Sequence, residues 1–280
     1  MKTIGIISLA GNVEQENVEK AKLNLENFGF RVKLSSNIYD KNRYLAGSDE
    51  SKIKAFNEFL LDDEIDIIMS SRGGYGSIRL INKLDYELIK KHPKMIVGYS
   101  DITALLLMIY KNTRLMTYHG PMLVSDFVEP NIFTLKSFLG AINGDSLLIE
   151  PNKLYKKGES SGIIWGGNLS TVVSLCGLDF IPNEDFIFFA EDLNEPCYKI
   201  DKMFYQLFNI DKFRKNCKAI ILGDFLDVNN EEWLDKLFTE LALGLNIPVL
   251  KVSNITHEKE KLTIPIGTKC LIKASKILIN

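Results

Sequence analysis

The first half of the chain alternates short apolar runs with amphipathic segments, and this alternation limits the possible folds more than any other feature of the sequence. The apolar runs have the length of buried strands, and the segments between them repeat apolar residues at helical spacing. The expected strands are 3–9, 30–34, 65–69, 94–97 and 115–118, and the expected helices cover 18–28, 53–60 and 132–142. Buried strands that alternate with helices indicate a parallel, doubly wound sheet.

The rhythm changes at residues 146–160, which are polar and rich in helix and strand breakers and therefore predict a linker. We predict an α/β protein of two domains: residues 1–145, Rossmann- or flavodoxin-like, and residues 161–280, smaller and with some antiparallel pairing in a mixed sheet. In the second domain the expected strands are 162–165, 186–190, 219–222, 248–252, 262–264 and 269–272, and the expected helices are 169–175, 200–208 and 233–243.

Composition excludes several classes of protein. A formal net charge of -2 gives no long-range field to attract nucleic acid or an anionic membrane. No apolar run reaches the roughly 18 residues that a membrane-spanning helix needs. The four cysteines show no C-x-x-C spacing, so neither a zinc site nor a disulfide framework is indicated. We expect a cytoplasmic protein that binds no metal, no nucleic acid and no membrane.

The segment Lys94–Asp101 has the pattern of a nucleophile elbow. A strand-like run leads into Gly98-Tyr99-Ser100, and a helical pattern begins at Asp101. In α/β hydrolases a serine on such a strand-to-helix turn is held clear of the sheet, at a helix N-terminus that tolerates negative charge. The usual elbow is G-x-S-x-G, and here Ile102 replaces the second glycine. The alternative is that Ser100 or Asp101 caps the helix, which helix-start statistics favour for this stretch alone.

A serine nucleophile needs a general base, usually a histidine that a carboxylate orients. The chain has three histidines. His92 precedes a proline at the wrong end of the predicted sheet. His119 ends the strand after the elbow helix, so topology favours it as the base, with a role in the pocket wall as the alternative. His257 lies in a polar loop that is distant from Ser100 in sequence.

The glycine-rich segment 73–76 follows the third predicted strand. It lacks the Lys-Ser/Thr of a P-loop and the G-x-G-x-x-G spacing of a dinucleotide site. Exposed backbone donors near a nucleophile suit an oxyanion hole, which Gly73 or Gly74 could form with the N–H of Asp101. Arg72 could pair with a substrate carboxylate in a bidentate manner, or it could belong to a structural ion pair.

A buried run in the second half, 186–190, is followed directly by Glu191 and Asp192. Carboxylates at the end of such a strand either cap a helix or belong to a site. Because Glu191 comes one step after five apolar residues, it risks partial burial and should have a partner.

Taken together, these motifs resemble the LD-carboxypeptidase family of serine peptidases, which includes muramoyl-tetrapeptide carboxypeptidases and microcin-immunity peptidases. The resemblance spans nearly the whole chain. In order, the matching segments are 71–76, 79–80, 84–85, 93–104, 119–122, 166–170, 191–195, 198–201, 248–249 and 262–267.

The resemblance implies a Ser-Glu-His triad divided between the domains. Ser100 of the first domain is the expected nucleophile, and His257 and Glu191 of the second are the expected base and its orienting partner. His119 then becomes a pocket residue beside the elbow. The family hydrolyses the amide between an L-centre diamino acid and the terminal D-alanine of murein tetrapeptides, through an acyl-enzyme. It needs no metal or cofactor, serves cell-wall peptide recycling in the cytoplasm and tends to form homodimers.

One departure from the family pattern concerns the loop that carries the base. Thr256 stands where family members usually have glycine, and the segment 258–261 is unusually charged. A β-branched residue does not adopt a positive φ cheaply, so this loop could run differently from that of the family. Two alternatives therefore stay open: an amidase for microcin-type peptide-nucleotides, and a peptide-binding relative that has lost turnover.

Overall fold

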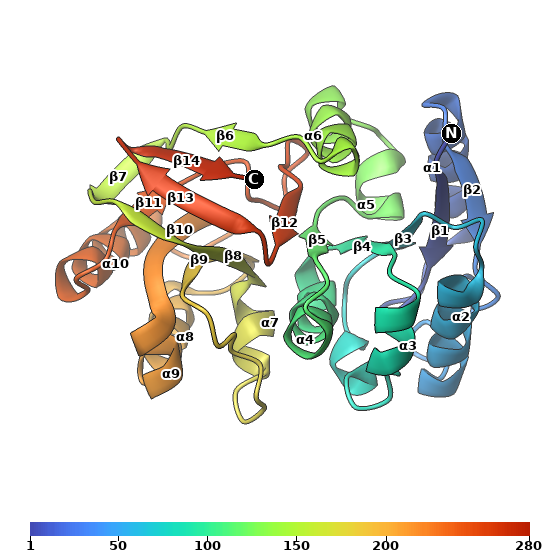
Figure 1. Cartoon of the computed structure of the whole chain (residues 1–280), viewed down its shortest axis with the longest axis horizontal. Helices are drawn as coiled ribbons and strands as arrows, with labels where there is room; N and C mark the ends of the chain where they lie inside the picture. Colours follow the sequence, from blue (N-terminus) through green and yellow to red (C-terminus); the bar gives the residue numbers. More distant parts are fainter. The chain divides into compact units, whose positions relative to one another are not determined.

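The computed structural model describes residues 1–280, which form two units, Met1–Phe138 and Leu139–Asn280. In Figure 1 the first unit runs from blue to green and the second from green to red. Both units are α/β, the first with a parallel sheet and the second with a mixed sheet. The predicted fold class is therefore confirmed. No helix is both long and apolar enough to cross a membrane.

The sheet of the first unit has the strand order β5-β4-β3-β1-β2. Each neighbouring pair in this order is parallel. The strands are β1 (Thr3–Ile7), β2 (Arg31–Leu34), β3 (Ile67–Ser70), β4 (Met95–Gly98) and β5 (Thr117–His119). Every residue of β1 and β3 is buried, as expected of central parallel strands that are covered on both faces.

Helices cover both faces of this sheet, with α1 and α5 on one side and α2, α3 and α4 on the other (Figure 1). Their bounds are α1 (Gln15–Asn27), α2 (Asp49–Leu61), α3 (Tyr86–Lys91), α4 (Thr103–Thr113), α5 (Leu123–Phe127) and α6 (Ile132–Asn143), with short 3-10 turns η1 (Ser77–Leu80) and η2 (Ser100–Ile102). Ser48 caps α2 through a bond from the N–H of Ser51 at 3.1 Å. This doubly wound arrangement brings the carboxyl ends of β3, β4 and β5 to one edge.

The sheet of the second unit has the order β6-β14-β13-β8-β9-β10-β11-β7. Its central strands β8 to β11 are parallel, and antiparallel strands flank them on both sides. The bounds are β6 (Leu147–Ile149), β7 (Lys153–Lys156), β8 (Ser160–Asn168), β9 (Phe186–Leu193), β10 (Cys217–Leu226), β11 (Val249–Lys251), β13 (Lys269–Lys273) and β14 (Lys276–Ile279), with β12 at Ile264–Ile266. The segment 146–160, expected to be a linker, thus contains two edge strands.

An aromatic core lies between this sheet and its helices. Trp165, Phe186, Phe188 and Phe213 are fully buried, and the rings of Phe188 and Phe213 are 5.1 Å apart, edge to face. The helices are α7 (Leu169–Ser174), α8 (Cys197–Phe208), α9 (Asp211–Asn216) and α10 (Glu231–Gly244). This packing holds β9 and β10 side by side, and these two strands carry polar residues of the second unit that are described below.

Candidate active site

Ser100 lies on a sharp turn between β4 and α4. Its φ is +59°, in the left-handed region that a residue with a Cβ atom rarely adopts. β4 ends at Gly98, Tyr99 is extended, and a 3-10 turn from Ser100 leads into α4. Backbone strain of this kind concentrates at functional sites, and a strained serine between strand and helix is the geometry of a nucleophile elbow.

Neither Ser100 nor Asp101 occupies the N-cap position of η2 or α4. The residues at the N-cap positions of η2 and α4 are Tyr99 and Ile102, and neither makes a side-chain capping bond. The Asp101 carboxylate instead accepts a bond from the backbone N–H of Ser77 at 2.9 Å, and the Ser77 hydroxyl donates to the Asp101 carbonyl. Burial raises the pKa of the Asp101 carboxyl, and the bonds from Ser77 oppose the shift. Asp101 therefore ties the elbow to the segment after the glycines.

Gly73 lies directly beside the serine. A Cβ atom built on Gly73 would be 3.0 Å from the Cβ of Ser100 and 3.1 Å from its Oγ. The Gly73 carbonyl accepts a bond from the N–H of Gly11 at 3.1 Å, which fixes the backbone here. Glycine thus leaves space at the hydroxyl and brings backbone atoms close to it, as an oxyanion hole requires.

His119 ends β5 beside the same turn. It is buried, it pairs with Gly98 in the sheet, and its ring lies 5.9 Å from that of Tyr99 in an edge-to-face contact. The N–H of Gly120 donates to the carbonyl of Gly98 at 3.1 Å. His119 is therefore held as part of the wall behind the elbow.

Arg72 is exposed at the mouth of a pocket of about 530 Å³. Within the first unit its guanidinium donates to the carbonyl oxygen of Asn12 at 3.3 Å, and no structural ion pair holds it. The pocket is lined by Gly11, Asn12, Tyr44, Arg72, Gly74 and Tyr75. The Tyr44 and Tyr75 rings meet edge to face at 5.8 Å, so the pocket combines one cation with aromatic walls.

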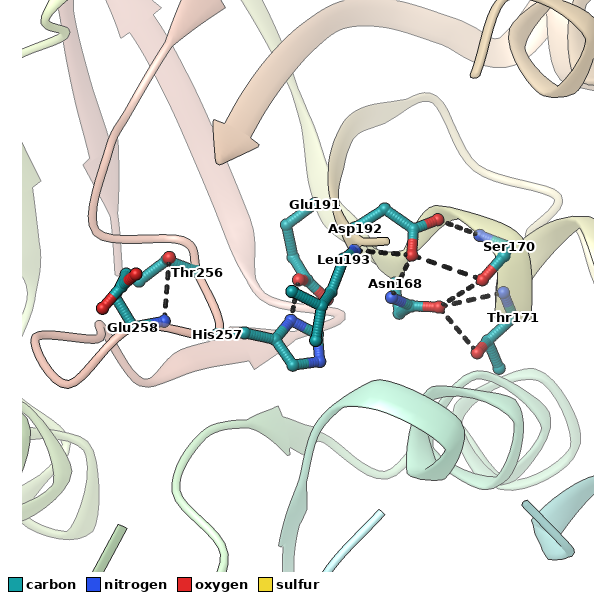
Figure 2. A network of polar contacts seen from close by, with 9 residues as sticks. All are labelled: Asn168, Ser170, Thr171, Glu191, Asp192, Leu193, Thr256, His257 and Glu258. Carbon is teal, nitrogen blue, oxygen red and sulfur yellow. Dashed lines mark hydrogen bonds and ion pairs between the residues drawn. The ribbon is translucent and has the colours of Figure 1, made fainter. Parts of the chain in front are cut away.

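In the second unit, Glu191 and His257 form a close pair, shown in Figure 2. The Nδ1 atom of His257 is 2.6 Å from Oε2 of Glu191. Glu191 is 0% exposed and the His257 side chain 13% exposed. An ionised carboxylate only accepts hydrogen bonds, so the neutral imidazole carries its proton on Nδ1 and presents Nε2 as an acceptor. This is how a carboxylate prepares a histidine to act as a general base.

The strand next to Glu191 approaches the His257 loop at Gly223. The register between β9 and β10 shifts between Leu222 and Phe225. A Cβ atom on Gly223 would lie 2.3 Å from the carbonyl oxygen of Ile255 and 2.9 Å from the Cβ of Glu191. Only glycine permits this approach, so Gly223 allows the loop and the carboxylate to meet.

The substitution Gly223→Ala is expected to lower the free energy of unfolding by about 3 kcal/mol, because the added methyl group must displace backbone. It should also separate His257 from Glu191. Denaturant unfolding measures the first effect. The control is Gly244→Ala, where a Cβ atom would meet nothing within 4 Å and stability should be unchanged or slightly higher. Equal effects of the two substitutions would contradict the claim that β10 needs a glycine at position 223.

Asp192 lies beside Glu191 but faces a different set of partners (Figure 2). Its carboxylate accepts bonds from Asn168 Nδ2 at 2.9 Å, the Ser170 N–H at 2.8 Å and the Leu193 N–H at 2.9 Å. Asn168 in turn caps α7. Burial raises the pKa of Asp192 to about 6, and the neighbouring charge of Glu191 adds to the rise. Asp192 therefore joins the ends of β8 and β9 to the start of α7.

This raised pKa predicts how stability depends on pH. Between its ordinary value and about 6 the folded state binds more protons at Asp192 than the unfolded state, so stability falls as pH rises through this window and is level above it. A shift of about 2 units corresponds to about 3 kcal/mol. The free energy of unfolding of the wild type minus that of Asp192→Asn should therefore fall by about this amount from pH 3 to pH 7. A constant difference would contradict the prediction.

No group of three or more His, Cys, Asp or Glu side chains is placed to hold a metal ion. The predicted residues instead form two sets. Ser100, Asp101, Gly73, Gly74, Arg72 and His119 belong to the first unit, and Glu191 and His257 belong to the second.

Several residues that shape these two sets were not identified from the sequence. Gly223 carried a weak signal, as a glycine that directly follows the apolar run 219–222. Tyr44 carried none, because an exposed tyrosine in a loop has no periodicity. Tyr75 belonged to the quoted segment 71–76, but its place in a pocket wall was not predicted. Asn168 belonged to a quoted motif, but its role as a bridge between Asp192 and α7 depends on a contact distant in sequence.

Known proteins resemble this chain in sequence and in fold. Residues 4–120 match the LD-carboxypeptidase N-terminal domain and residues 161–272 match the LD-carboxypeptidase C-terminal domain. A probable murein peptide carboxypeptidase of Bacillus subtilis (strain 168) is 31% identical over 98% of this chain and 89% of its own length. The microcin C7 self-immunity protein MccF of Escherichia coli is 32% identical over 82% of this chain and 77% of its own.

Among solved structures, the muramoyltetrapeptide carboxypeptidase from Oxalobacter formigenes has a TM-score of 0.92 at 27% identity and covers 99% of this chain and 98% of its own. The two family domains match most of the sequence, and the probable murein peptide carboxypeptidase of Bacillus subtilis matches nearly all of it. The chain therefore belongs to the LD-carboxypeptidase family of peptidases.

Proposed function

We propose that the chain is a serine LD-carboxypeptidase that removes the terminal D-alanine from murein tetrapeptides during cell-wall peptide recycling in the cytoplasm. The observation that carries the proposal is the fully buried Glu191 carboxylate with His257 Nδ1 at 2.6 Å. A buried carboxylate is costly, and its pairing with an imidazole matches the orienting half of a serine-peptidase triad. The strained Ser100 turn provides a matching nucleophile. By family resemblance we also propose a homodimer.

In the proposed reaction, Ser100 Oγ attacks the scissile carbonyl carbon while His257 Nε2 accepts the hydroxyl proton. The imidazolium that forms is stabilised by Glu191 through Nδ1. Backbone N–H groups near Gly73, Gly74 and Asp101 stabilise the negative oxygen of the tetrahedral intermediate. His257 then protonates the leaving amine of D-alanine, which leaves an acyl-enzyme on Ser100. Water, deprotonated by His257, hydrolyses this ester and restores the serine.

We propose that Arg72 binds the terminal carboxylate of the peptide. It is adjacent in sequence to Gly73, which touches Ser100, and no carboxylate of the first unit pairs with it. A guanidinium can bind a carboxylate through two parallel hydrogen bonds. A carboxypeptidase must distinguish a free chain end from an internal residue, and a cation at this position supplies that selection.

The test is incubation with a defined murein tetrapeptide and mass analysis of the products. We expect the tripeptide and free D-alanine, and no cleavage of the same peptide with L-alanine at its end. If the tetrapeptide binds tightly but stays intact, and a serine-reactive phosphonate fails to label Ser100, the chain is instead a peptide-binding relative without turnover.

A second candidate function is hydrolysis of a microcin-type peptide-nucleotide amide. It is favoured by the pocket beside Arg72, which has a volume of about 530 Å³ and is lined by two tyrosines. This volume is larger than a single alanine fills. Planar groups pack well against such aromatic side chains. Rates on a tetrapeptide and on an aminoacyl sulfamoyl nucleoside, measured with one enzyme preparation, decide between the two: the substrate with the larger kcat/KM identifies the function.

A further inference from the structure

Thr256, the residue that departs from the family pattern, is buried and bonds to its own loop through its hydroxyl. Its Oγ1 accepts a bond from the N–H of Glu258 at 3.0 Å, which spans His257 (Figure 2). The carboxylate of Asp224 on β10 is nearby: burial raises its pKa, and Lys251 and the Thr256 hydroxyl lower it. Thr256 is 1% exposed. The hydroxyl therefore joins the residues on both sides of the histidine and lies near a side chain on β10.

Asp224 holds this loop through its backbone as well. Its N–H donates to the carbonyl of Ile255 at 2.8 Å, one residue before Thr256. Its carboxylate lies 3.4 Å from Lys251 Nζ on β11, and Glu258 is the other charge near it. Since Asp224 follows Gly223, these contacts begin where β10 comes closest to Glu191.

The remainder of the loop is closed on itself. The N–H of Leu262 donates to the carbonyl of Asn254 at 2.8 Å, and Asn254 Nδ2 donates to the carbonyl of Glu260 at 3.2 Å. Thr256 has no positive φ, so threonine fits its backbone without strain. In this chain the threonine therefore adds an anchoring bond that a glycine at the same position lacks.

We propose that Thr256 and Asp224 are a positioning pair that holds the His257 imidazole against Glu191. The Thr256–Glu258 bond and the Asp224–Ile255 backbone bond fix the loop that carries the histidine. Neither residue takes part in proton transfer. Their effect on turnover rests on the proposed function, whereas their effect on the orientation of the imidazole does not.

Loss of the hydroxyl should act on kcat and leave KM unchanged. Without the bond to Glu258 and the contact with Asp224, residues 256–258 can rotate, and Nδ1 of His257 no longer stays on Glu191 Oε2. Displacement of a catalytic group by about 1 Å costs as much as 100-fold in rate. The residues proposed above to bind the substrate, in the first unit, make none of these bonds.

The test compares Thr256→Val, which keeps the shape and removes the hydroxyl, with Thr256→Ser, which keeps the hydroxyl. We expect kcat to fall about 10- to 100-fold for valine and to recover within about threefold for serine, with KM constant. Asp224→Ala should lower kcat less than valine, because it removes the contact with Asp224 and keeps the bond from Glu258. The double variant should lose no more than Thr256→Val, in which the contact with Asp224 is already absent. Thermal unfolding shows which variants remain folded.

The second measurement is the NMR signal of the His257 Nδ1 proton in the full chain. It should be sharp and protected from exchange in the wild type and Thr256→Ser, and broadened in Thr256→Val. Equal kcat and equal spectra for valine and serine would overturn the positioning pair. If the wild type cleaves no peptide, the proposed function fails, and the spectra still decide the role of Thr256.

Discussion

Replacing Ser100 with alanine is expected to abolish release of D-alanine from a murein tetrapeptide. The variant lacks the only oxygen that could form the acyl-enzyme, and loss of a serine nucleophile lowers kcat by about 10⁴-fold or more. The fold should be retained, because Ser100 occupies no N-cap position and alanine keeps the Cβ atom. Mass analysis of the peptide and thermal unfolding of the variant measure the two expectations.

The matched control is Ser174→Ala, which removes an exposed hydroxyl whose bond goes to the Thr171 carbonyl on α7. This variant should keep wild-type turnover. Normal turnover by Ser100→Ala would rule out a serine mechanism for this chain. If Ser100→Ala lost both turnover and folding, phosphonate labelling of the wild type would decide whether Ser100 is the nucleophile. The phosphonate should modify Ser100 alone.

The second large effect is expected for Glu191→Gln. The change keeps the volume of the side chain but removes the charge that stabilises a protonated His257. An amide can also turn its NH₂ group toward Nδ1 and so favour the wrong tautomer, and a comparable Asp→Asn change in a serine protease lowers kcat by about 10⁴-fold. We expect a loss of about this size, with substrate affinity preserved, measured as kcat and KM for the tetrapeptide.

Glu258→Gln is the control for this prediction, because Glu258 is adjacent to His257 in sequence, is exposed, and offers the loop only its backbone N–H. It should retain at least about half of the wild-type kcat, as is typical of surface substitutions. If Glu191→Gln and Glu258→Gln behaved alike, Glu191 would be a buried structural carboxylate and not the partner of a general base.

The fold was predictable because its strands are buried and its helices amphipathic. Residues 67–69 of β3 and 186–190 of β9, for example, are uninterrupted apolar runs. Three short helices, α3, α5 and α9, were not predicted, since five or six residues are too few to show a helical period. The edge strands β6 and β7 were hidden by their polar composition, which suits an edge but resembles a linker.

Residues of the candidate site could be proposed from the sequence where their signal is local, and not where it depends on contacts distant in sequence. Ser100 was identifiable because an elbow is local in sequence, and Glu191 because burial of a carboxylate requires a partner. Topology alone pointed to His119, which pairs with Gly98 at the end of β4 and packs on Tyr99. The contacts around Thr256 could not be predicted: Asp224 is distant in sequence, and the expected effect of a β-branched residue depended on a positive φ that Thr256 does not have.

The left-handed backbone at position 100 has a consequence for selection experiments. A glycine there would remove the strain of the φ of +59° and raise the free energy of unfolding by roughly 1 kcal/mol. Thermal stability therefore favours glycine at this position, whereas the proposed turnover requires serine. A library sorted only for survival at high temperature should accordingly accumulate Ser100→Gly, and its most robust members would be inert. Directed evolution of this scaffold therefore needs a catalytic screen in every round.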